Sequence, residues 1–75
     1  MNKIILNKGK DKAAWQLHPW IFSGAIARVS ESLQNGDIVS VYNHDDEFIA
    51  YGMYNKQSRV AVRLLEWDPQ KEISE

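Results

Sequence analysis

Residues 37–67 read DIVSVYNHDDEFIAYGMYNKQSRVAVRLLEW, and this stretch decides the fold. Residues 37–43, 47–54 and 59–67 follow a period of two that divides them between two faces; Val39 and Val41, for example, share one face, and Ile38, Ser40 and Tyr42 share the other. Such alternation is typical of β-strands that bury one face. The segments between them are short and rich in Asn, Asp, Lys and Ser, as hairpin turns are. The stretch therefore predicts three antiparallel strands joined as a meander.

A glycine at position 52 interrupts the middle strand of this meander. Glycine within a strand marks a bulge, a sharp bend or the close approach of another backbone. Small sheets are bent in this way when they roll into barrels. Gly52 therefore predicts that the meander curls on itself.

Two further extended segments precede the meander. Residues 3–6 form a short, β-branched run, and residues 25–30 also have the composition of a strand. Gly9 lies in a polar turn, where a positive φ is available to glycine but resisted by other residues. A turn is also expected at residues 34–36.

A short helix is expected between these two extended segments. Asp11 is placed to act as its N-cap, and residues 12–17 would form about two turns. Pro19 would end the helix, because the residue before a proline is kept out of the helical region. The expected buried side consists of Ala14, Trp15 and Leu17. The prediction is a mostly β, small α+β fold: a pseudo-barrel with a short plug helix.

Residues 17–26, LHPWIFSGAI, concentrate rigid and bulky side chains just after this helix. We expect Trp20 and Phe22 to seal the barrel below the helix, and Ser23-Gly24 to form a small polar surface beside the lysine-bearing loop around Gly9. A small barrel needs large side chains to fill it. Core positions are therefore expected for Trp15, Phe22 and Trp67, whereas Trp20 and Tyr54 fit a core and a base-stacking surface equally well.

The overall composition indicates a single small globular domain. The chain has 75 residues, 44% hydrophobic residues and a net charge of −1. No segment approaches the roughly 20 apolar residues of a membrane span, and no secretory signal is present. The absence of cysteine excludes disulfides and fits a cytoplasmic protein. Residues 1–28 carry five basic residues against one acid, a net +4, whereas residues 29–75 carry four against nine, a net −5. This asymmetry permits a basic face.

The residues that usually carry catalysis or bind metals form no recognisable motif. The four glycines are too far apart for a phosphate-binding loop. His18 and His44 are 26 positions apart, which is not the spacing of a local zinc site. We expect Asp45, Asp46 and Glu47 to form a solvated turn. The sequence therefore predicts no catalytic residue and no metal site.

Nucleic-acid binding requires cations for phosphates and flat polar or aromatic groups for bases. The sequence contains several residues of both kinds. They fall around Gly9, along residues 18–28 and at the turn near residue 56. His18 is expected to pack beside Pro19 with one ring nitrogen hydrogen-bonded, and Arg63 to extend along the sheet or pair with Glu66. The candidate RNA-binding residues are Lys8, Gly9, Lys10, Lys12, His18, Trp20, Ser23, Gly24, Arg28, Tyr54, Asn55, Lys56 and Arg59.

The strings HPWIFSGAI (residues 18–26) and NGDIVSVYNHDDEFIAYGMYNKQSRVAVRLL (residues 35–65) carry a family resemblance. Together with Lys8-Gly9-Lys10, they resemble the N-terminal PUA domain of bacterial S-adenosylmethionine-dependent large-subunit ribosomal RNA methyltransferases of the cytosine-5 type. The resemblance covers about residues 3–67. It implies a PUA-like RNA-binding domain over residues 1–67, followed at residues 68–75 by a linker or the start of the next domain.

The resemblance also implies where RNA and the cofactor belong. RNA would lie against the short helix, the glycine-bearing loop before it and a neighbouring strand. In that family the methyl-donor site and the catalytic cysteine lie downstream. This fragment is therefore expected to be no enzyme by itself and to bind no cofactor, whereas S-adenosylmethionine would bind in the catalytic domain of its parent. The expected partners are ribosomal RNA and that catalytic domain. The alternative function is a docking module, between domains or proteins, with little RNA affinity of its own.

Overall fold

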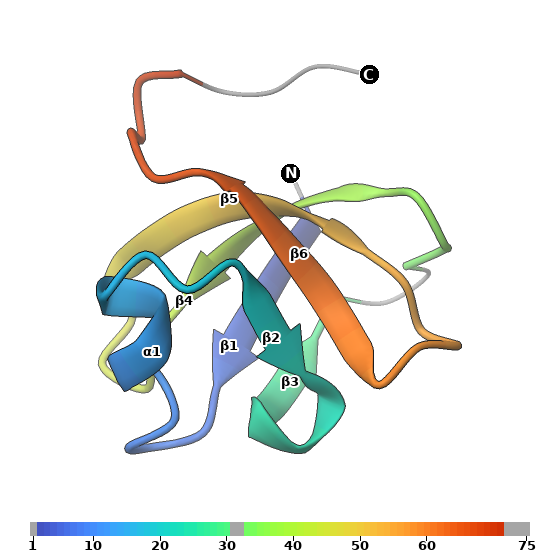
Figure 1. Ribbon diagram of the computed structural model, residues 1–75, viewed down its shortest axis with the longest axis horizontal. Coiled ribbons are helices and arrows are strands. Elements are labelled where there is room, and N and C mark those ends of the chain that lie inside the picture. Colours follow the sequence, from blue (N-terminus) through green and yellow to red (C-terminus); the bar gives the residue numbers. More distant parts are fainter. Residues whose placement is uncertain (1, 31–32, 72–75) are drawn as a thin grey trace.

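The computed structural model describes residues 2–30 and 33–71, which form one curled β-sheet with a single turn of α-helix at one end (Figure 1). In chain order the elements are β1 (Asn2–Leu6), α1 (Lys12–Trp15), β2 (Trp20–Phe22), the 3₁₀ turn η1 (Ser23–Ala25), β3 (Ile26–Val29), β4 (Ile38–Tyr42), β5 (Phe48–Tyr54) and β6 (Val60–Glu66).

The sheet contains the predicted meander and three further pairings. Its strand order is β2-β6-β5-β4-β1-β3. The β4–β5 and β5–β6 pairs are antiparallel, so the prediction of a meander is confirmed. β1 pairs with β4 in parallel and with β3 in antiparallel orientation, and β2 adds antiparallel to β6.

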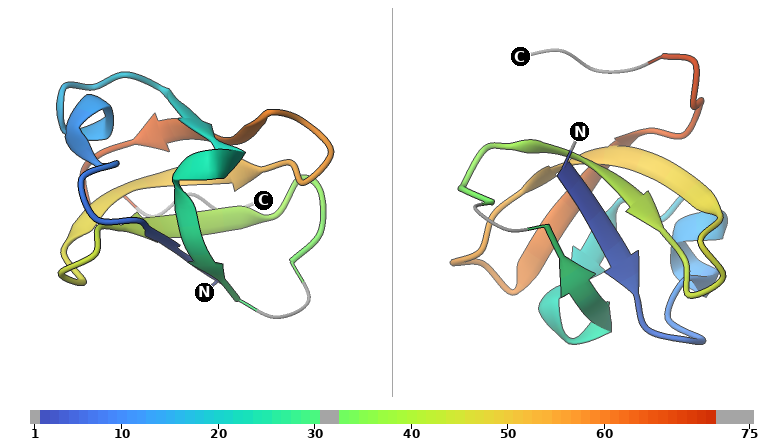
Figure 2. Two further views of the ribbon diagram at one scale, coloured as in Figure 1. Left: turned by 90° about the horizontal axis from the view of Figure 1, so that it is seen from below. Right: turned by 180° about the vertical axis from the view of Figure 1, so that it is seen from behind.

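The two end strands of this sheet, β2 and β3, are consecutive in the chain. Only the three residues of η1 separate them, and such a link spans at most about 14 Å. The ends of the sheet must therefore lie close together, so the sheet curls (Figure 2). The Ser23 N–H donates to the Arg59 carbonyl at 2.9 Å, and the Asn7 N–H donates to the Ala25 carbonyl at 2.8 Å, which fastens η1 to both sides. The predicted mostly β pseudo-barrel is confirmed.

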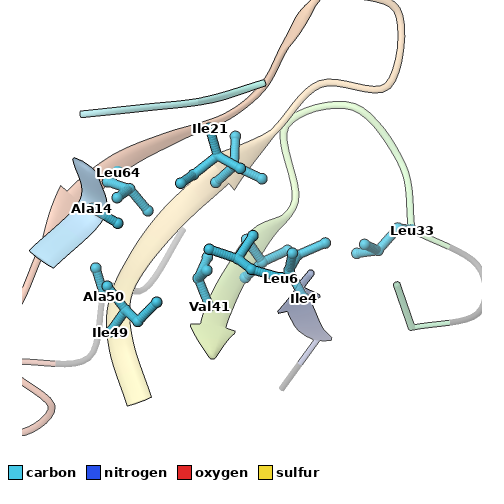
Figure 3. Packing of buried hydrophobic residues seen from close by; sticks show 11 residues of the cluster. Ile4, Leu6, Ala14, Ile21, Leu33, Val41, Ile49, Ala50 and Leu64 are labelled. Carbon is cyan, nitrogen blue, oxygen red and sulfur yellow. The ribbon is translucent and has the colours of Figure 1, made fainter. Parts of the chain in front are cut away.

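The core fills the concave side of the curled sheet (Figure 3). Every strand except β3 contributes a fully or almost fully buried side chain, and α1 contributes Ala14. The largest fully buried side chains are Ile4, Leu6, Val39, Val41, Ile49 and Val62. The alternation in β4 is as expected, with Val39 and Val41 facing the core.

Gly52 lies at the bulge between β5 and β6. A Cβ atom at this position would lie 2.7 Å from the Arg63 carbonyl oxygen and 2.7 Å from Val62 Cγ1. Of the three alternatives predicted for Gly52, the structure shows both a bulge and the close approach of another backbone. Gly9 and Gly36 have φ values of 81° and 89°, as their turns require.

The plug helix is shorter and less buried than expected. It ends at Trp15, and the chain reverses through Leu17, which has a φ of 67°. The Leu17 N–H donates to the Ala14 carbonyl and the His18 N–H to the Ala13 carbonyl, the pattern of a Schellman C-cap. The helix is therefore ended by this C-cap and not, as predicted, by Pro19. The expected burial of Trp15 and Leu17 is wrong, because they are 47% and 63% exposed.

The prediction that Trp20 and Phe22 seal the barrel is also wrong. Their side chains are 47% and 50% exposed, whereas Ile21 between them is only 4% exposed. Successive side chains of a strand point to opposite faces, so the burial of Ile21 turns both neighbours outward. Trp67 is partly buried against the core, and its indole N–H donates to the Ala14 carbonyl at 2.9 Å, so its expected core position is confirmed in part.

Candidate nucleic-acid interface

A groove of about 460 Å³ lies where α1, the loop before it, β2 and η1 meet. Four of the predicted RNA-binding residues, Lys10, His18, Trp20 and Gly24, line it. The other lining residues are Ala13, Ala14, Ile21, Phe22 and Ala25. The fold thus brings together residues that are up to 15 positions apart in the chain.

The lysine loop, residues 8–12, contributes Lys10 to one wall of this groove. Gly9 turns the chain with its positive φ, and the Lys10 N–H closes the turn on the Asn7 carbonyl at 3.0 Å. Asn7 in turn bonds to η1 through its backbone N–H and, at 3.5 Å, through its side-chain amide to the Gly24 carbonyl. All three lysines are exposed, and none forms an ion pair within residues 2–30 and 33–71. Only Lys10 lines the groove; Lys8 and Lys12 lie outside its lining.

Asp11 positions α1 but does not cap it with its side chain. One carboxylate oxygen accepts the Trp15 indole N–H at 2.7 Å and the Asn43 amide at 3.3 Å. These bonds, the Trp15 bond above all, lower the pKa of Asp11 below its ordinary value, against an opposing contribution from burial. Asp11 is therefore ionised at neutral pH and joins α1 to the β4–β5 turn.

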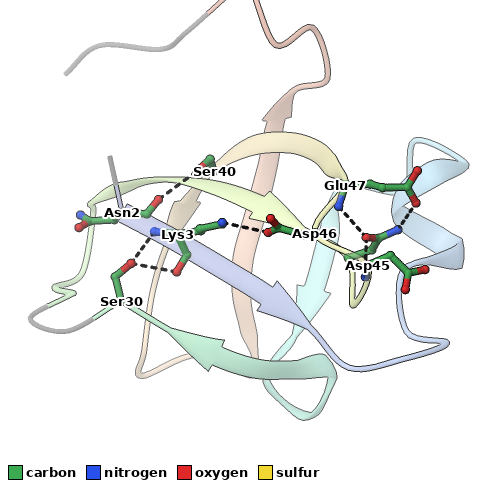
Figure 4. A network of polar contacts seen from close by, with 8 residues as sticks. Asn2, Lys3, Ser30, Ser40, Asp45, Asp46 and Glu47 are labelled. Atoms are coloured by element: carbon green, nitrogen blue, oxygen red, sulfur yellow. Dashed lines mark hydrogen bonds and ion pairs between the residues drawn. The ribbon is translucent and has the colours of Figure 1, made fainter.

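Asn43, buried at the start of that turn, anchors the other end of this connection. Its side-chain oxygen accepts the backbone N–H groups of Asp45 and Glu47, and its amide donates to the Glu47 carboxylate at 2.9 Å (Figure 4). Hydrogen bonds to both the oxygen and the nitrogen therefore hold the Asn43 side chain in the orientation in which it donates to Asp11. Nothing in the sequence pattern indicated this role, because residues 11 and 43 are distant in the chain.

Three exposed rings, of His18 just before β2 and of Trp20 and Phe22 on β2, follow one another on the other wall of the groove. His18 and Trp20 meet edge to face with ring centroids 6.1 Å apart, and Trp20 and Phe22 do so at 6.4 Å. The Trp20 N–H donates to His18 Nδ1 at 3.3 Å, as the expectation of a bonded ring nitrogen required. Phe22 was not among the predicted site residues, because its expected place was the core.

The predicted residues of the β5–β6 turn lie outside the groove. Asn55 lines a smaller hollow of about 220 Å³, together with Met53, Ser58, Val60 and Arg63. Tyr54 packs partly buried against the core, while Lys56 and Arg59 are exposed. Arg63 is exposed and forms no ion pair in the described part of the chain, so the expected pairing with Glu66 is absent.

Arg28 lies in a third hollow of about 440 Å³, formed by β1, β3 and the β4–β5 turn. There Lys3 pairs with Asp46 at 2.9 Å (Figure 4). The Lys3 ammonium group also lies 4.3 Å from the centroid of the Tyr42 ring. Ser30 secures this edge by accepting the Lys3 N–H at 2.7 Å and donating to the Lys3 carbonyl. The structure does not bring Arg28 into the groove.

The described residues contain no group of three or more His, Cys, Asp or Glu side chains that could hold a metal ion. Within the same ranges, no helix is long and apolar enough to cross a membrane.

Comparisons with known proteins give one family match. The family model described as "PUA-like domain" matches residues 4–67. Among curated proteins, "Ribosomal RNA large subunit methyltransferase I" of Escherichia coli strain SMS-3-5 is 34% identical over 71 residues. The protein of the same name in strain SE11 is 32% identical over 71 residues. The alignments cover 95% of this chain but only 18% of these relatives.

Two solved structures have the same fold. A conserved PUA domain protein from Thermoplasma acidophilum superposes with a TM-score of 0.76 at 18% identity, over 92% of this chain and 50% of its own. A chain of an H/ACA ribonucleoprotein bound to a substrate RNA containing 2′-deoxyuridine superposes with a TM-score of 0.73 at 21% identity, over 95% of this chain and 25% of its own. At these identities the similarity establishes the fold.

Proposed function

This chain belongs to the PUA-like domain family, and on that premise we propose that it is an RNA-binding module of a ribosomal RNA methyltransferase. In this proposal it holds large-subunit ribosomal RNA for a catalytic domain further along a longer protein. The observation that carries the proposal is the groove, in which Lys10 of the lysine loop lies together with exposed aromatic rings. No lysine of this loop forms an ion pair with another described residue. Cations suit phosphates and rings suit bases, so the two walls supply both kinds of contact.

The proposed RNA-binding residues divide according to these two roles. Lys8, Lys10 and Lys12 contact phosphates, and Gly9 and Gly24 leave room for the RNA backbone. His18, Trp20 and Ser23 contact bases or riboses along β2 and η1. The remaining candidates, Arg28, Tyr54, Asn55, Lys56 and Arg59, lie outside the groove and would extend the contact on either side.

The parent protein is proposed by similarity to relatives that are named as methyltransferases and are much longer than this chain. S-adenosylmethionine would bind in their catalytic part, and the reaction would take place in the cytoplasm, where bacterial ribosomal RNA is modified. Residues 68–75 are proposed as the connection to that part. In support, the Tyr51 hydroxyl donates to the Pro69 carbonyl at 2.7 Å, which directs the chain away from β6 along a defined path.

Replacing Lys8, Lys10 and Lys12 together by glutamine tests this function. The slope of log K against log salt falls by roughly 0.7 to 0.9 for each phosphate that the protein no longer neutralises. We expect weaker binding to a structured ribosomal RNA fragment and a slope flatter by about two units if two or three lysines bind phosphate. Titrations of the domain at several salt concentrations measure both quantities.

The matched control is Lys71→Gln, which removes an exposed lysine that lies outside the groove. It should leave most of the affinity and the slope in place. The thermal midpoint of the triple variant should stay near that of the wild type, since exposed substitutions usually change stability by less than about 0.5 kcal/mol. If the wild-type domain fails to bind RNA even at low salt, the proposed function is wrong and docking becomes the better account.

A further inference from the structure

The convex face of β2, β6 and β5 carries a row of exposed side chains that the groove does not explain. Trp20 on β2 lies directly opposite Arg63 on β6, and Arg63 lies directly opposite Met53 on β5. Residues directly opposite in antiparallel strands point to the same face with Cβ atoms about 5 Å apart. The three side chains therefore form one row across β2, β6 and β5, which are neighbours in the sheet. Two further exposed side chains adjoin this row along the strands: Phe22 follows Trp20 on β2, and Leu65 follows Arg63 on β6. We call these five residues the sheet platform.

Four of the five platform residues are large and apolar, and all four are exposed to solvent. Trp20, Phe22, Met53 and Leu65 are each 44–50% exposed, and Arg63 is exposed as well. Large apolar side chains gathered on one face of a small domain indicate a contact surface. The perpendicular rings of Trp20 and Phe22 hold each other in place and leave part of each ring open to solvent.

Basic residues lie within and beside the platform, on β6 and in the β5–β6 turn. From Phe48 to Leu65 the chain carries Lys56, Arg59 and Arg63 and no acidic residue. The hollow beside Arg63 adds the polar side chains of Asn55 and Ser58. A polyanion with flat, apolar rings complements such a surface, because it offers charge to the arginines and stacking faces to the aromatic rings.

The platform is continuous with the groove. Trp20 and Phe22 line the groove and also belong to the platform, because β2 is the end strand of the sheet and lies between the two surfaces. The lysine loop thus lies on one side of β2 and the cations of the β5–β6 turn on the other. The phosphates of an RNA chain that crosses β2 could therefore contact the lysine loop on one side of the rings and the cations of the β5–β6 turn on the other.

We propose that the sheet platform binds an unpaired stretch of RNA, with bases stacked on Trp20 and Phe22 and a phosphate held by Arg63. The inference rests on the proposed RNA-binding function and names the form of RNA that this site takes. Stacking on a side chain requires a free base face, which a duplex hides between neighbouring base pairs. The platform therefore selects single strands, with little preference for base identity.

The test compares two RNA ligands on the same domain. One is an unpaired oligouridine of about ten nucleotides, and the other is a blunt RNA duplex of the same length. Trp20→Ala and Phe22→Ala should each weaken oligouridine binding by about five- to a hundredfold, the range expected when one base can no longer stack. Arg63→Gln should weaken it and flatten its salt slope by roughly 0.7. Duplex binding should change by less than about twofold in all three variants.

Matched controls separate this site from general effects. Val29→Ala truncates a side chain of similar exposure on β3, at the opposite end of the sheet order, and Lys71→Gln removes a cation outside the platform. Both should keep oligouridine affinity within about twofold. Trp20→Phe should restore part of the affinity that Trp20→Ala removes, and 5-iodouridine in the oligonucleotide should cross-link to the peptide that contains residues 18–22.

The outcomes distinguish this inference from the proposed function. If the platform variants bind oligouridine as the wild type does while the lysine-loop variant does not, RNA binding stands but the platform proposal is overturned, and this face is left for a protein partner. Tighter binding of the duplex than of the single strand would overturn it equally. If the wild type binds the structured ribosomal RNA fragment but neither of these ligands, the platform proposal alone is overturned. If it binds none of the three RNAs at low salt, the proposed function itself fails.

Discussion

At the scale of single residues, Gly52 is the one glycine of the four that another strand approaches closely. The β5–β6 bulge brings the Arg63 carbonyl so near that no side chain fits. Gly52→Ala should therefore destabilise the domain by about 1–3 kcal/mol or more, because neither a carbonyl of a paired strand nor the buried Val62 can move aside cheaply. Urea unfolding of the variant measures this destabilisation.

Gly24→Ala is the matched control for this substitution, since no atom lies within 4 Å of the added Cβ and its φ is not positive. Its free energy of unfolding should stay within about 0.5 kcal/mol of the wild type. Equal stability of the two variants would mean that the bulge opens without cost.

Leu17 carries a second local strain, because a branched side chain occupies the left-handed position that ends α1. The left-handed conformation costs a non-glycine residue roughly 1–2 kcal/mol, and a 63% exposed side chain recovers little of this by burial. Leu17→Gly should therefore be more stable than Leu17→Ala by about 1 kcal/mol in thermal or urea unfolding. If the alanine variant is the more stable of the two, Leu17 is not left-handed in solution.

At the scale of elements, α1 is too short to be stable alone and depends on its tertiary bonds. Trp15, Asp11 and Asn43 form a chain of hydrogen bonds from the helix to the β4–β5 turn, and Trp67 holds the helix from the core side through the Ala14 carbonyl. The groove wall formed by α1 is thus positioned by residues that lie outside the groove.

The lowered pKa of Asp11 makes this connection dependent on pH. A carboxylate whose pKa is lower in the folded state stabilises the fold fully above its unfolded pKa, ordinarily 3.8, and loses this contribution as the pH falls through the folded pKa. Wild type should therefore exceed Asp11→Asn in unfolding free energy at neutral pH. The difference should shrink below about pH 4, measured by urea unfolding at a series of pH values. If wild type and Asp11→Asn differ in unfolding free energy by the same amount down to acid pH, the charge of Asp11 does not contribute to stability.

At the scale of the whole molecule, the short η1 link determines where the proposed surfaces lie. Because it joins the two end strands, it closes the sheet and places β2 next to the lysine loop. The same closure leaves the convex face of β2, β6 and β5 open. The groove and the platform therefore share one strand, and a single RNA chain can contact both.

The sequence by itself determined the features that depend on neighbouring residues. The alternation in residues 37–67 predicted the meander, and Gly9, Gly36 and Gly52 marked positions that only glycine accepts easily. The family resemblance, confirmed by the match over residues 4–67, indicated the same fold. These predictions succeeded because strand periodicity and backbone sterics act over a few residues.

Only the tertiary structure decided which segments pair and which aromatic rings are exposed. The parallel β1–β4 pair and the β2–β6 pair join segments far apart in the chain, and no local pattern encodes the partner of a strand. Composition favoured the core for Trp15 and Phe22, yet the alternation around Ile21 and the bond from Trp15 to Asp11 keep both at the surface. Burial of a side chain depends on the face that its element turns toward the core, and that face is set when the whole sheet closes.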